Sequence, residues 1–360
     1  MKAGPYEAFD PGGGTAMVLP ESKDRLKKVD AVVFDCDGTL IDARRSYDAT
    51  VMKTAETMVE RFSTVKLPMD DVGGEMIMKI RSTGGFNSDW DTTYALSVLS
   101  YVAIERCRAD GAAGLDRILT RLGELVGDFC STNRLAGHSS VDRYIARRGL
   151  ASGEWGRFRE FLGFPGSAKQ SLMAATFDEV YYGGRLFREV YGATPAVWHD
   201  QGLIDQETLF VGREDIVRFM KVIGGAKMAI ATGRPLVAVR HTMGSLLRYF
   251  EMDASVYIGD GDIYPELASE LAKYRKPSGA SLVRAREKLS AKVMLYIGDS
   301  AEDRLMVDNA RRQYRNILFA GIYGSSFDEQ SQISYFRRTR SDLVVRSVNQ
   351  VPAVLEMIGR

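Results

Sequence analysis

Short apolar runs that end in polar residues recur along the chain, once near its start and repeatedly in its second half. A continuous apolar run of this length is typical of a strand buried on both faces of a parallel sheet. The runs occupy residues 31–34, 227–231, 256–258, 293–297, 316–320 and 343–345. Segments with the apolar spacing of a helix separate the later runs, at residues 214–223, 236–249, 280–289 and 301–312. This alternation predicts an α/β fold with a doubly wound, mostly parallel sheet.

The long middle of the chain has a different pattern. Helical apolar spacing dominates there, at residues 46–62, 94–108, 114–129 and 177–191, and strand-like runs are scarce. A stretch from residue 42 to residue 204 is too long for a simple crossover. We therefore interpret residues 42–204 as an inserted, mostly helical domain, and residues 30–41 and 205–360 as a Rossmann-like core. The glycines, prolines and charges of residues 1–29 predict a loosely ordered lead-in that ends in a short helix.

Composition narrows the class of protein. A chain of 360 residues with 45% hydrophobic and 26% charged residues is ordinary for a two-domain globular protein. A net charge of +1 gives no reason to expect nucleic acid or an acidic membrane as a partner. The three cysteines form no CxxC pair, which argues against a disulfide framework. With no long apolar run and no secretory pattern at the start, we expect a cytoplasmic protein.

Asp35 and Asp37 stand out because they directly follow the first apolar run. Gly38 and Thr39 then force a sharp exit from the strand, so that a carboxylate projects from its carboxyl end. Such a carboxylate can attack phosphorus when a divalent cation neutralises the approaching phosphate. Asp37, on the same loop, could donate a proton to the leaving oxygen. The structural alternative is an Asp-rich turn that caps a helix.

Five later residues favour a chemical role for these aspartates. Thr232 ends the second run with a hydroxyl, and Gly233 lets backbone amides approach a phosphate. Lys276 could balance the charges of a carboxylate and a phosphate. Asp299 and Asp303 lie one helical turn apart, a spacing that suits a hard cation such as Mg²⁺. Each residue has a plain alternative as a helix cap, a solvated charge or an acid in a first helical turn.

Taken together, these segments resemble the four motifs of the haloacid dehalogenase superfamily. The matching segments are Asp35-Cys36-Asp37-Gly38-Thr39-Leu40, Thr232-Gly233-Arg234, Lys276-Pro277 and Gly298-Asp299-Ser300-Ala301-Glu302-Asp303. The resemblance implies that Asp35 is the phosphate-accepting nucleophile and a Mg²⁺ ligand. It also implies that Asp37 is the general acid and base, with its backbone carbonyl on the metal.

The same resemblance implies roles for the remaining motif residues. Thr232 would hydrogen-bond the phosphoryl oxygens, with Gly233 and Arg234 beside it at the substrate. Lys276 would pair with Asp35. Asp299 would bind Mg²⁺ directly, and Asp303 would support the metal through water or an outer contact. The insertion resembles the helical cap that closes over the site in this superfamily.

One loop of the predicted cap could select the substrate. Residues 81–91 combine a cation at Arg81, an amide at Asn87 and an aromatic ring at Trp90. These three side chains are candidates for contact with the substrate. The alternative is a connecting loop in which Asp89 caps a helix and Trp90 packs in the domain core.

The predicted function is hydrolysis of a small phosphorylated metabolite by an enzyme that depends on Mg²⁺ and forms an aspartyl-phosphate. The presence of Asp37 disfavours dehalogenation, because the dehalogenases of the superfamily lack that second aspartate. One alternative is a phosphosugar mutase that uses the same Asp35 chemistry, and another is a non-catalytic binding member. The sequence leaves the substrate open, and it leaves open whether the protein forms a homo-oligomer.

Overall fold

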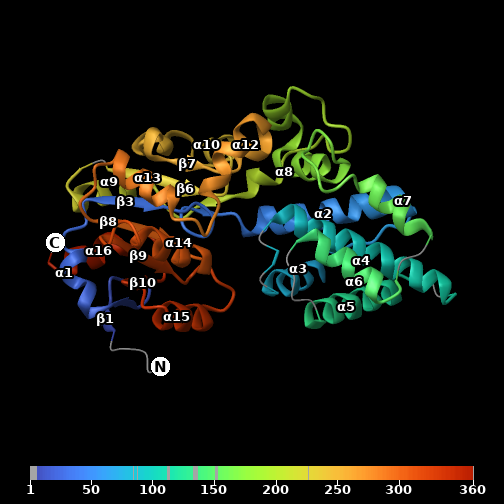
Figure 1. The fold of residues 1–360 in the computed structure, drawn as a ribbon, viewed down its shortest axis with the longest axis horizontal. Helices are drawn as coiled ribbons and strands as arrows, with labels where there is room; N and C mark the ends of the chain where they lie inside the picture. The colour runs from blue at the N-terminus through green and yellow to red at the C-terminus, as the bar shows by residue number, and fades with distance from the viewer. Residues whose placement is uncertain are drawn as a thin grey trace. The chain divides into compact units, whose positions relative to one another are not determined.

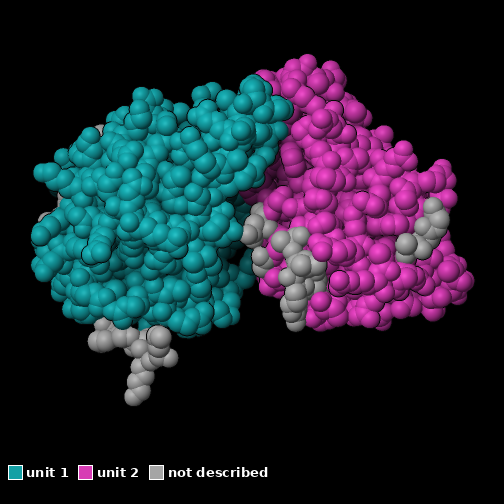
Figure 2. All heavy atoms as spheres, in the orientation of Figure 1, with its two compact units in different colours: residues 1–44, 207–360 teal, residues 45–206 magenta. Residues whose placement is uncertain are grey.

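The computed structural model describes residues 6–83, 85–86, 88–111, 114–132, 137–150, 153–225 and 227–359. The chain forms two compact units (Figure 2). One consists of Met1–Arg44 and Glu207–Arg360, and the other of Arg45–Gln206. The sequence analysis placed the inserted domain at residues 42–204.

An eight-stranded sheet forms the centre of the first unit (Figure 1), with the strand order β1-β2-β10-β9-β8-β3-β6-β7. The six strands from β10 to β7 in this order are parallel to one another, which confirms the predicted fold class. Their bounds are β3 (Ala31–Phe34), β6 (Met228–Thr232), β7 (Val256–Tyr257), β8 (Met294–Gly298), β9 (Ile317–Ile322) and β10 (Leu343–Val345). Each lies on one of the predicted apolar runs.

The register of β3 sets the position of the site. Phe34, its last residue, pairs with Ile297 of β8 on one side and Ile230 of β6 on the other. Because the three strands are parallel, the residues that follow them meet at one edge of the sheet. Open α/β sheets place their binding sites at this carboxyl edge.

The prediction of a loosely ordered lead-in is wrong for the described residues 6–29. β1 (Glu7–Phe9) and β2 (Ala16–Val18) form an antiparallel pair, and β2 also pairs with β10. A 3₁₀ turn η1 (Pro20–Ser22) and a short helix α1 (Lys23–Leu26) follow. Strands of three residues carry almost no periodic signal, and the partner strand β10 lies at the far end of the sequence. Local pattern therefore could not reveal them.

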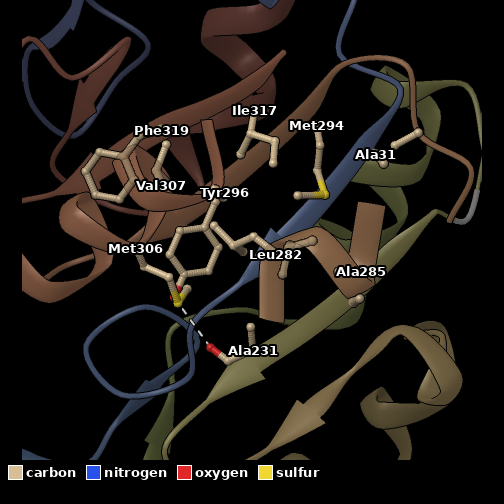
Figure 3. Packing of buried hydrophobic residues seen from close by; sticks show 14 of the residues in the cluster. Ala31, Ala231, Leu282, Ala285, Met294, Tyr296, Met306, Val307, Ile317 and Phe319 are labelled. Atoms are coloured by element: carbon tan, nitrogen blue, oxygen red, sulfur yellow. Dashed lines mark hydrogen bonds between the residues drawn. The ribbon is translucent and has the colours of Figure 1, made fainter. Parts of the chain in front are cut away.

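Helices cover both faces of the sheet. Figure 3 shows one face, where Tyr296 of β8 packs with Leu282 of α13 and Met306 of α14 in a fully buried cluster. On the other face, the ring of Phe34 lies against Phe219 of α9, with 5.1 Å between ring centroids. This two-sided burial explains why the strands read as continuous apolar runs.

Four helices of this unit lie on the predicted segments, and they are α9 (Arg213–Ile223), α10 (Leu236–Met243), α13 (Ala280–Lys288) and α14 (Ala301–Arg311). The helices α11 (Asp260–Ile263), α12 (Pro265–Leu271), α15 (Glu329–Arg338) and α16 (Gln350–Met357) were not predicted. Short 3₁₀ helices also occur at η3 (Gly244–Tyr249), η4 (Met252–Ala254) and η5 (Ala272–Tyr274). The single helix predicted over 236–249 is divided at Gly244, whose φ of +51° is incompatible with a continuing α-helix.

Among the described residues of the second unit, the regular structure is helical, with loops between the helices and one isolated bridge between Gly183 and Gln201. Its helices are α2 (Arg44–Ser63), α3 (Gly73–Ser82), α4 (Asp89–Ala109), α5 (Leu115–Thr132), α6 (His138–Arg147), α7 (Gly153–Leu162), α8 (Leu172–Tyr191) and η2 (Leu203–Gln206). The short strands β4 (Ile41–Asp42) and β5 (Thr208–Leu209) pair where the chain leaves and re-enters the first unit. Within the described part of the chain, no helix is both long and apolar enough to cross a membrane.

Candidate active site

The loop after β3 is built as a tight turn around the carbonyl of Cys36. That oxygen accepts hydrogen bonds from the amides of Thr39, Leu40 and Ile41 at 2.8–3.1 Å. Gly38 makes the turn feasible, since its φ is +71° and a Cβ there would lie 1.9 Å from Asp299 Oδ2. The sharp exit predicted from the sequence therefore brings this loop directly against Asp299.

Asp35 lies at the centre of a buried charged cluster. Lys276 Nζ is 2.8 Å from Asp35 Oδ1 and 2.7 Å from Asp303 Oδ1. One carboxylate oxygen from each of Asp35, Asp299 and Asp303 lies within 4.8 Å of the other two. Asp35 is 5% exposed and Asp303 is fully buried. The structure thus brings together four of the residues that the sequence analysis assigned to one site.

The hydrogen bonds of Asp303 occupy both of its oxygens. Oδ1 accepts from Tyr296 Oη at 2.7 Å in addition to Lys276, and Oδ2 accepts from the Ser300 amide and hydroxyl at 3.0 and 2.7 Å. The Ser300 contacts form a capping box at the start of α14. Asp303 is therefore well placed to hold Lys276, and less suited to bind a cation directly.

Asp35 and Asp299 accept fewer hydrogen bonds and ion pairs than Asp303 does. Among the described residues, Asp35 gives one oxygen to Lys276, and Asp299 accepts from Ser325 Oγ at 3.1 Å through Oδ2. Each carboxylate keeps a second oxygen for a cation. Gln332 Nε2 donates to the backbone carbonyl of Asp299, which fixes the start of that loop.

Burial and the closeness of like charges shift the pKa values of the carboxylates in this cluster. Burial, with the nearby charges of Asp303 and Asp37, raises the pKa of Asp35 to about 7, although Lys276 opposes the shift. Burial and the charges of Asp303 and Asp35 likewise raise the pKa of Asp299 well above its ordinary value. Burial would also raise the pKa of Asp303, but Lys276 and its hydrogen bonds outweigh that effect and lower it.

This donor set fits a divalent cation. Among the residues that the structure describes, three carboxylates lie together with one ammonium, so negative charge exceeds positive charge in this cluster. Carboxylate oxygens are the ligands that Mg²⁺ prefers, usually from few residues and completed by water. A cation beside Asp35 and Asp299 would also reverse the upward shift of their pKa values.

The three residues of the second motif, Thr232, Gly233 and Arg234, have different surroundings. Thr232, at the end of β6, is fully buried, and its Oγ1 accepts from the Arg234 amide at 3.2 Å. Gly233 has open space where a side chain would stand, as an approach of substrate would require. The Arg234 guanidinium, however, is buried between carboxylates. Its Nε lies 3.4 Å from Asp37 Oδ1, and its Nη2 pairs with Glu207.

The candidate substrate residues of the helical unit have varied surroundings. The Arg81 guanidinium lies 2.6 Å from both Asp48 and Asp89, so its charge is balanced within the unit. Trp90 is partly buried in the first turn of α4, and the N-cap of that helix is Ser88 rather than Asp89. Asn87 lies outside the described residues. Contact of these residues with a substrate stays a prediction.

Sequence reasoning missed three residues that support the site. Ser325 follows β9, so the rule that sites lie at the carboxyl ends of strands could have pointed to it. Tyr296 lies inside a strand and appears in sequence as one more core residue. Glu207 lies in a short linker after the helical unit, and no local pattern marks it as a partner of Arg234.

The comparisons with known proteins agree with the fold and the position of the site. A doubly wound sheet with carboxylates and a lysine at its carboxyl edge is typical of an α/β protein with a ligand site at that edge. Residues 29–311 match the family model described as a haloacid dehalogenase-like hydrolase. The match spans well over half of the chain, so the protein belongs to the haloacid dehalogenase-like hydrolases. No curated protein matches the chain.

Two solved structures have a similar fold. An X-ray structure from the Northeast Structural Genomics Consortium is 18% identical with a TM-score of 0.61, and the match covers 92% of this chain and 99% of that one. Phosphatase Tt82 from Thermococcus thioreducens is 21% identical with a TM-score of 0.52, and the match covers 85% of this chain and 98% of that one. At these identities the likeness concerns the fold.

Proposed function

We propose that this protein is a Mg²⁺-dependent phosphomonoester hydrolase that acts on a small phosphorylated metabolite through an aspartyl-phosphate at Asp35. The observation that carries the proposal is the buried group formed by Asp35, Asp299, Asp303 and Lys276, in which negative charge exceeds positive charge. A cation and a phosphoryl group are the ligands that such a group would accept together.

The roles of the residues follow from their contacts. Asp35 Oδ1 is held by Lys276 at 2.8 Å, which orients the carboxylate as a nucleophile. As the bond from Asp35 to phosphorus forms, the bond from phosphorus to the leaving oxygen breaks, and Asp37 gives that oxygen a proton. Asp37 then takes a proton from water, which attacks the aspartyl-phosphate and releases phosphate. Mg²⁺, held by Asp35 and Asp299 with the Asp37 carbonyl, would neutralise charge on the phosphoryl oxygens.

We include in the proposal that the helical unit serves as a cap and selects the substrate. Its charged loop at Arg81 and Trp90 supplies the candidate contacts. We also propose that this chain catalyses the class of reaction that the name of the Thermococcus phosphatase gives. The cysteine usage supports a cytoplasmic location.

A panel of phosphomonoesters assayed with Mg²⁺ tests the proposal. Wild-type protein should release free phosphate in proportion to the substrate consumed, and Asp35→Asn should release none above background. Asp342→Asn is the matched control, because it neutralises another buried aspartate in the same unit. Conversion of a sugar phosphate to an isomer without net release of phosphate would instead identify a mutase. Full turnover by Asp35→Asn would contradict the proposed nucleophile.

A further inference from the structure

A second buried group of charges adjoins the site through Asp37. Arg234 and Glu207 form an ion pair whose side chains are 1% and 0% exposed. Thr242 Oγ1 donates to Glu207 Oε2 at 2.6 Å, and Arg234 Nε lies 3.4 Å from Asp37 Oδ1. Asp37 Oδ1 is itself buried, although 40% of the Asp37 side chain is exposed. One oxygen of Asp37 therefore faces the protein interior.

The four residues come from separate parts of the fold. Asp37 lies on the loop after β3, Arg234 on the loop after β6, Glu207 immediately before β5, and Thr242 on α10. Glu207 is also the first residue of the segment that returns to this unit. Only the assembled fold brings them into contact, so the arrangement fixes the β3 loop relative to its neighbours.

A buried guanidinium is costly unless a carboxylate pairs with it. Glu207 provides that partner from the interior, and the hydrogen bond from Thr242 limits the ways in which the Glu207 carboxylate can turn. The planar guanidinium then presents Nε to Asp37 in a fixed direction. Arg234 is thus occupied on its protein side and could not rotate towards a substrate without breaking a buried ion pair.

We propose that Glu207 and Arg234 are positioning residues that hold the Asp37 carboxyl group in the orientation needed to protonate the leaving oxygen. The inference rests on the proposed function, and it replaces the direct substrate contact first expected of Arg234. In this arrangement the exposed part of Asp37 is the part that would reach the leaving oxygen, while Oδ1 lies at ion-pair distance from Arg234. Without the anchor, Asp37 remains in place but samples orientations in which its proton does not reach the leaving group.

The consequence is a dependence on the leaving group. An alkyl phosphate expels a poor leaving group, so its cleavage needs the proton from Asp37 as the oxygen departs. p-Nitrophenyl phosphate expels a stable phenolate and needs that proton far less. Loss of orientation at Asp37 should therefore slow the alkyl phosphate more than the aryl phosphate. A general loss of folding would reduce both rates alike.

The experiment compares kcat/KM for glycerol phosphate and p-nitrophenyl phosphate, with Mg²⁺, in full-length wild-type, Glu207→Gln, Asp37→Asn and Asp342→Asn proteins. The quantity kcat/KM reports the step in which the leaving group departs, even when a later step limits turnover. We expect the alkyl-to-aryl ratio to fall about tenfold in Glu207→Gln and further in Asp37→Asn. Asp342→Asn, which also breaks a buried ion pair, should keep the wild-type ratio. Thr242→Val, which removes only the hydrogen bond to Glu207, should lower the ratio by a smaller factor if Glu207→Gln does not fold.

The double variant supplies a second criterion. If Glu207 acts through Asp37, Glu207→Gln should not lower the ratio further in an Asp37→Asn background. Equal losses for both substrates in Glu207→Gln and Thr242→Val would overturn the inference while leaving the proposed function intact. A wild-type protein that hydrolyses neither substrate would overturn the proposed function, and the inference with it. An unchanged ratio in Asp37→Asn would show that Asp37 is not the acid.

Discussion

Two buried groups of charged residues lie at opposite ends of the parallel strands of the sheet, one before a strand and one after two strands. Before β10, Asp342 is 1% exposed and fully satisfied. Its Oδ1 accepts from Ser22 Oγ and Arg25, and its Oδ2 accepts from Arg311 and the Phe319 amide. After β3 and β8, three carboxylates lie close together, and one lysine pairs with two of them. Both groups are buried, but Asp342 has a donor or cation for each of its oxygens, whereas the second group has more carboxylates than cations among the described residues.

The difference separates a structural role from a functional one. At Asp342, four donors, two of them cationic, occupy both carboxylate oxygens, so the group ties the N-terminal segment and α14 to the sheet. At Asp35, burial and like charges act against ionisation, which raises its pKa to about 7. A fold retains an arrangement of this kind when a ligand completes it, and the unmatched charge indicates what that ligand is. The following predictions test this contrast.

Neutralising Asp342 should have the largest effect on stability. Asp342→Asn removes the carboxylate that pairs with Arg311 and Arg25, and we expect the free energy of unfolding to fall by about 3 kcal/mol. Chemical denaturation of the variant and the wild-type protein measures the difference. A loss of stability no larger than that caused by substituting an exposed residue would show that the group around Asp342 has no structural role.

Removing the single cation of the other group should mainly affect activity. Lys276→Met leaves Asp35 and Asp303 without their shared partner, so phosphatase activity should fall roughly 10²–10³-fold. Steady-state kinetics with saturating Mg²⁺ measures it, and Lys292→Met is a control lysine on a loop before β8. Similar activities in the two variants would place Lys276 outside the reaction.

Mg²⁺ should stabilise the protein in a way that depends on pH. Because burial raises the folded-state pKa of Asp35 from 3.8 to about 7, the metal-free folded protein holds a proton that the unfolded chain has released. Its free energy of unfolding therefore falls as pH rises through this window. Saturating Mg²⁺ should add about 2.7 kcal/mol at about pH 8 and clearly less at about pH 5, where protons compete for the carboxylates. Thermal unfolding with and without Mg²⁺ at both pH values gives the comparison. Equal stabilisation at both would argue against a carboxylate site.

The smallest predicted effect is a gain in stability, whereas Asp342→Asn should lower stability. In metal-free protein at about pH 8, Asp35→Asn removes one of the crowded charges while Lys276 keeps Asp303. We expect stability to rise by about 1 kcal/mol. Denaturation in the presence of a chelator tests the sign. A clear destabilisation would mean that the Asp35 charge is already balanced by the protein.

The sequence predicted the parts of this molecule that depend on local pattern. The strand at residues 31–34 coincides with β3, because its four residues are all buried and continuously apolar. The grouping of Asp35, Lys276, Asp299 and Asp303 followed from the order of motifs at strand ends. Their placement needs only parallel strands in register, and the pairing of β3 with β8 supplies it.

What could not be predicted depends on contacts between distant segments. The strands β1 and β2 are stabilised by β10, more than 300 residues away in sequence. Glu207 becomes a partner of Arg234 only when its linker returns beside α10. For the same reason Arg234 was assigned to the substrate, since a cation after a strand gives no sign in sequence of a buried carboxylate beside it.

The central claim is that Asp35 accepts the phosphoryl group. The most direct measurement is acid quenching during turnover of p-nitrophenyl phosphate with Mg²⁺, followed by peptide mass spectrometry of wild-type and Asp37→Asn proteins. The account predicts a phosphorylated peptide that contains Asp35, with the modification on that residue and absent from Asp35→Asn. Phosphate found on another residue, or phosphate release by Asp35→Asn at the wild-type rate, would contradict it.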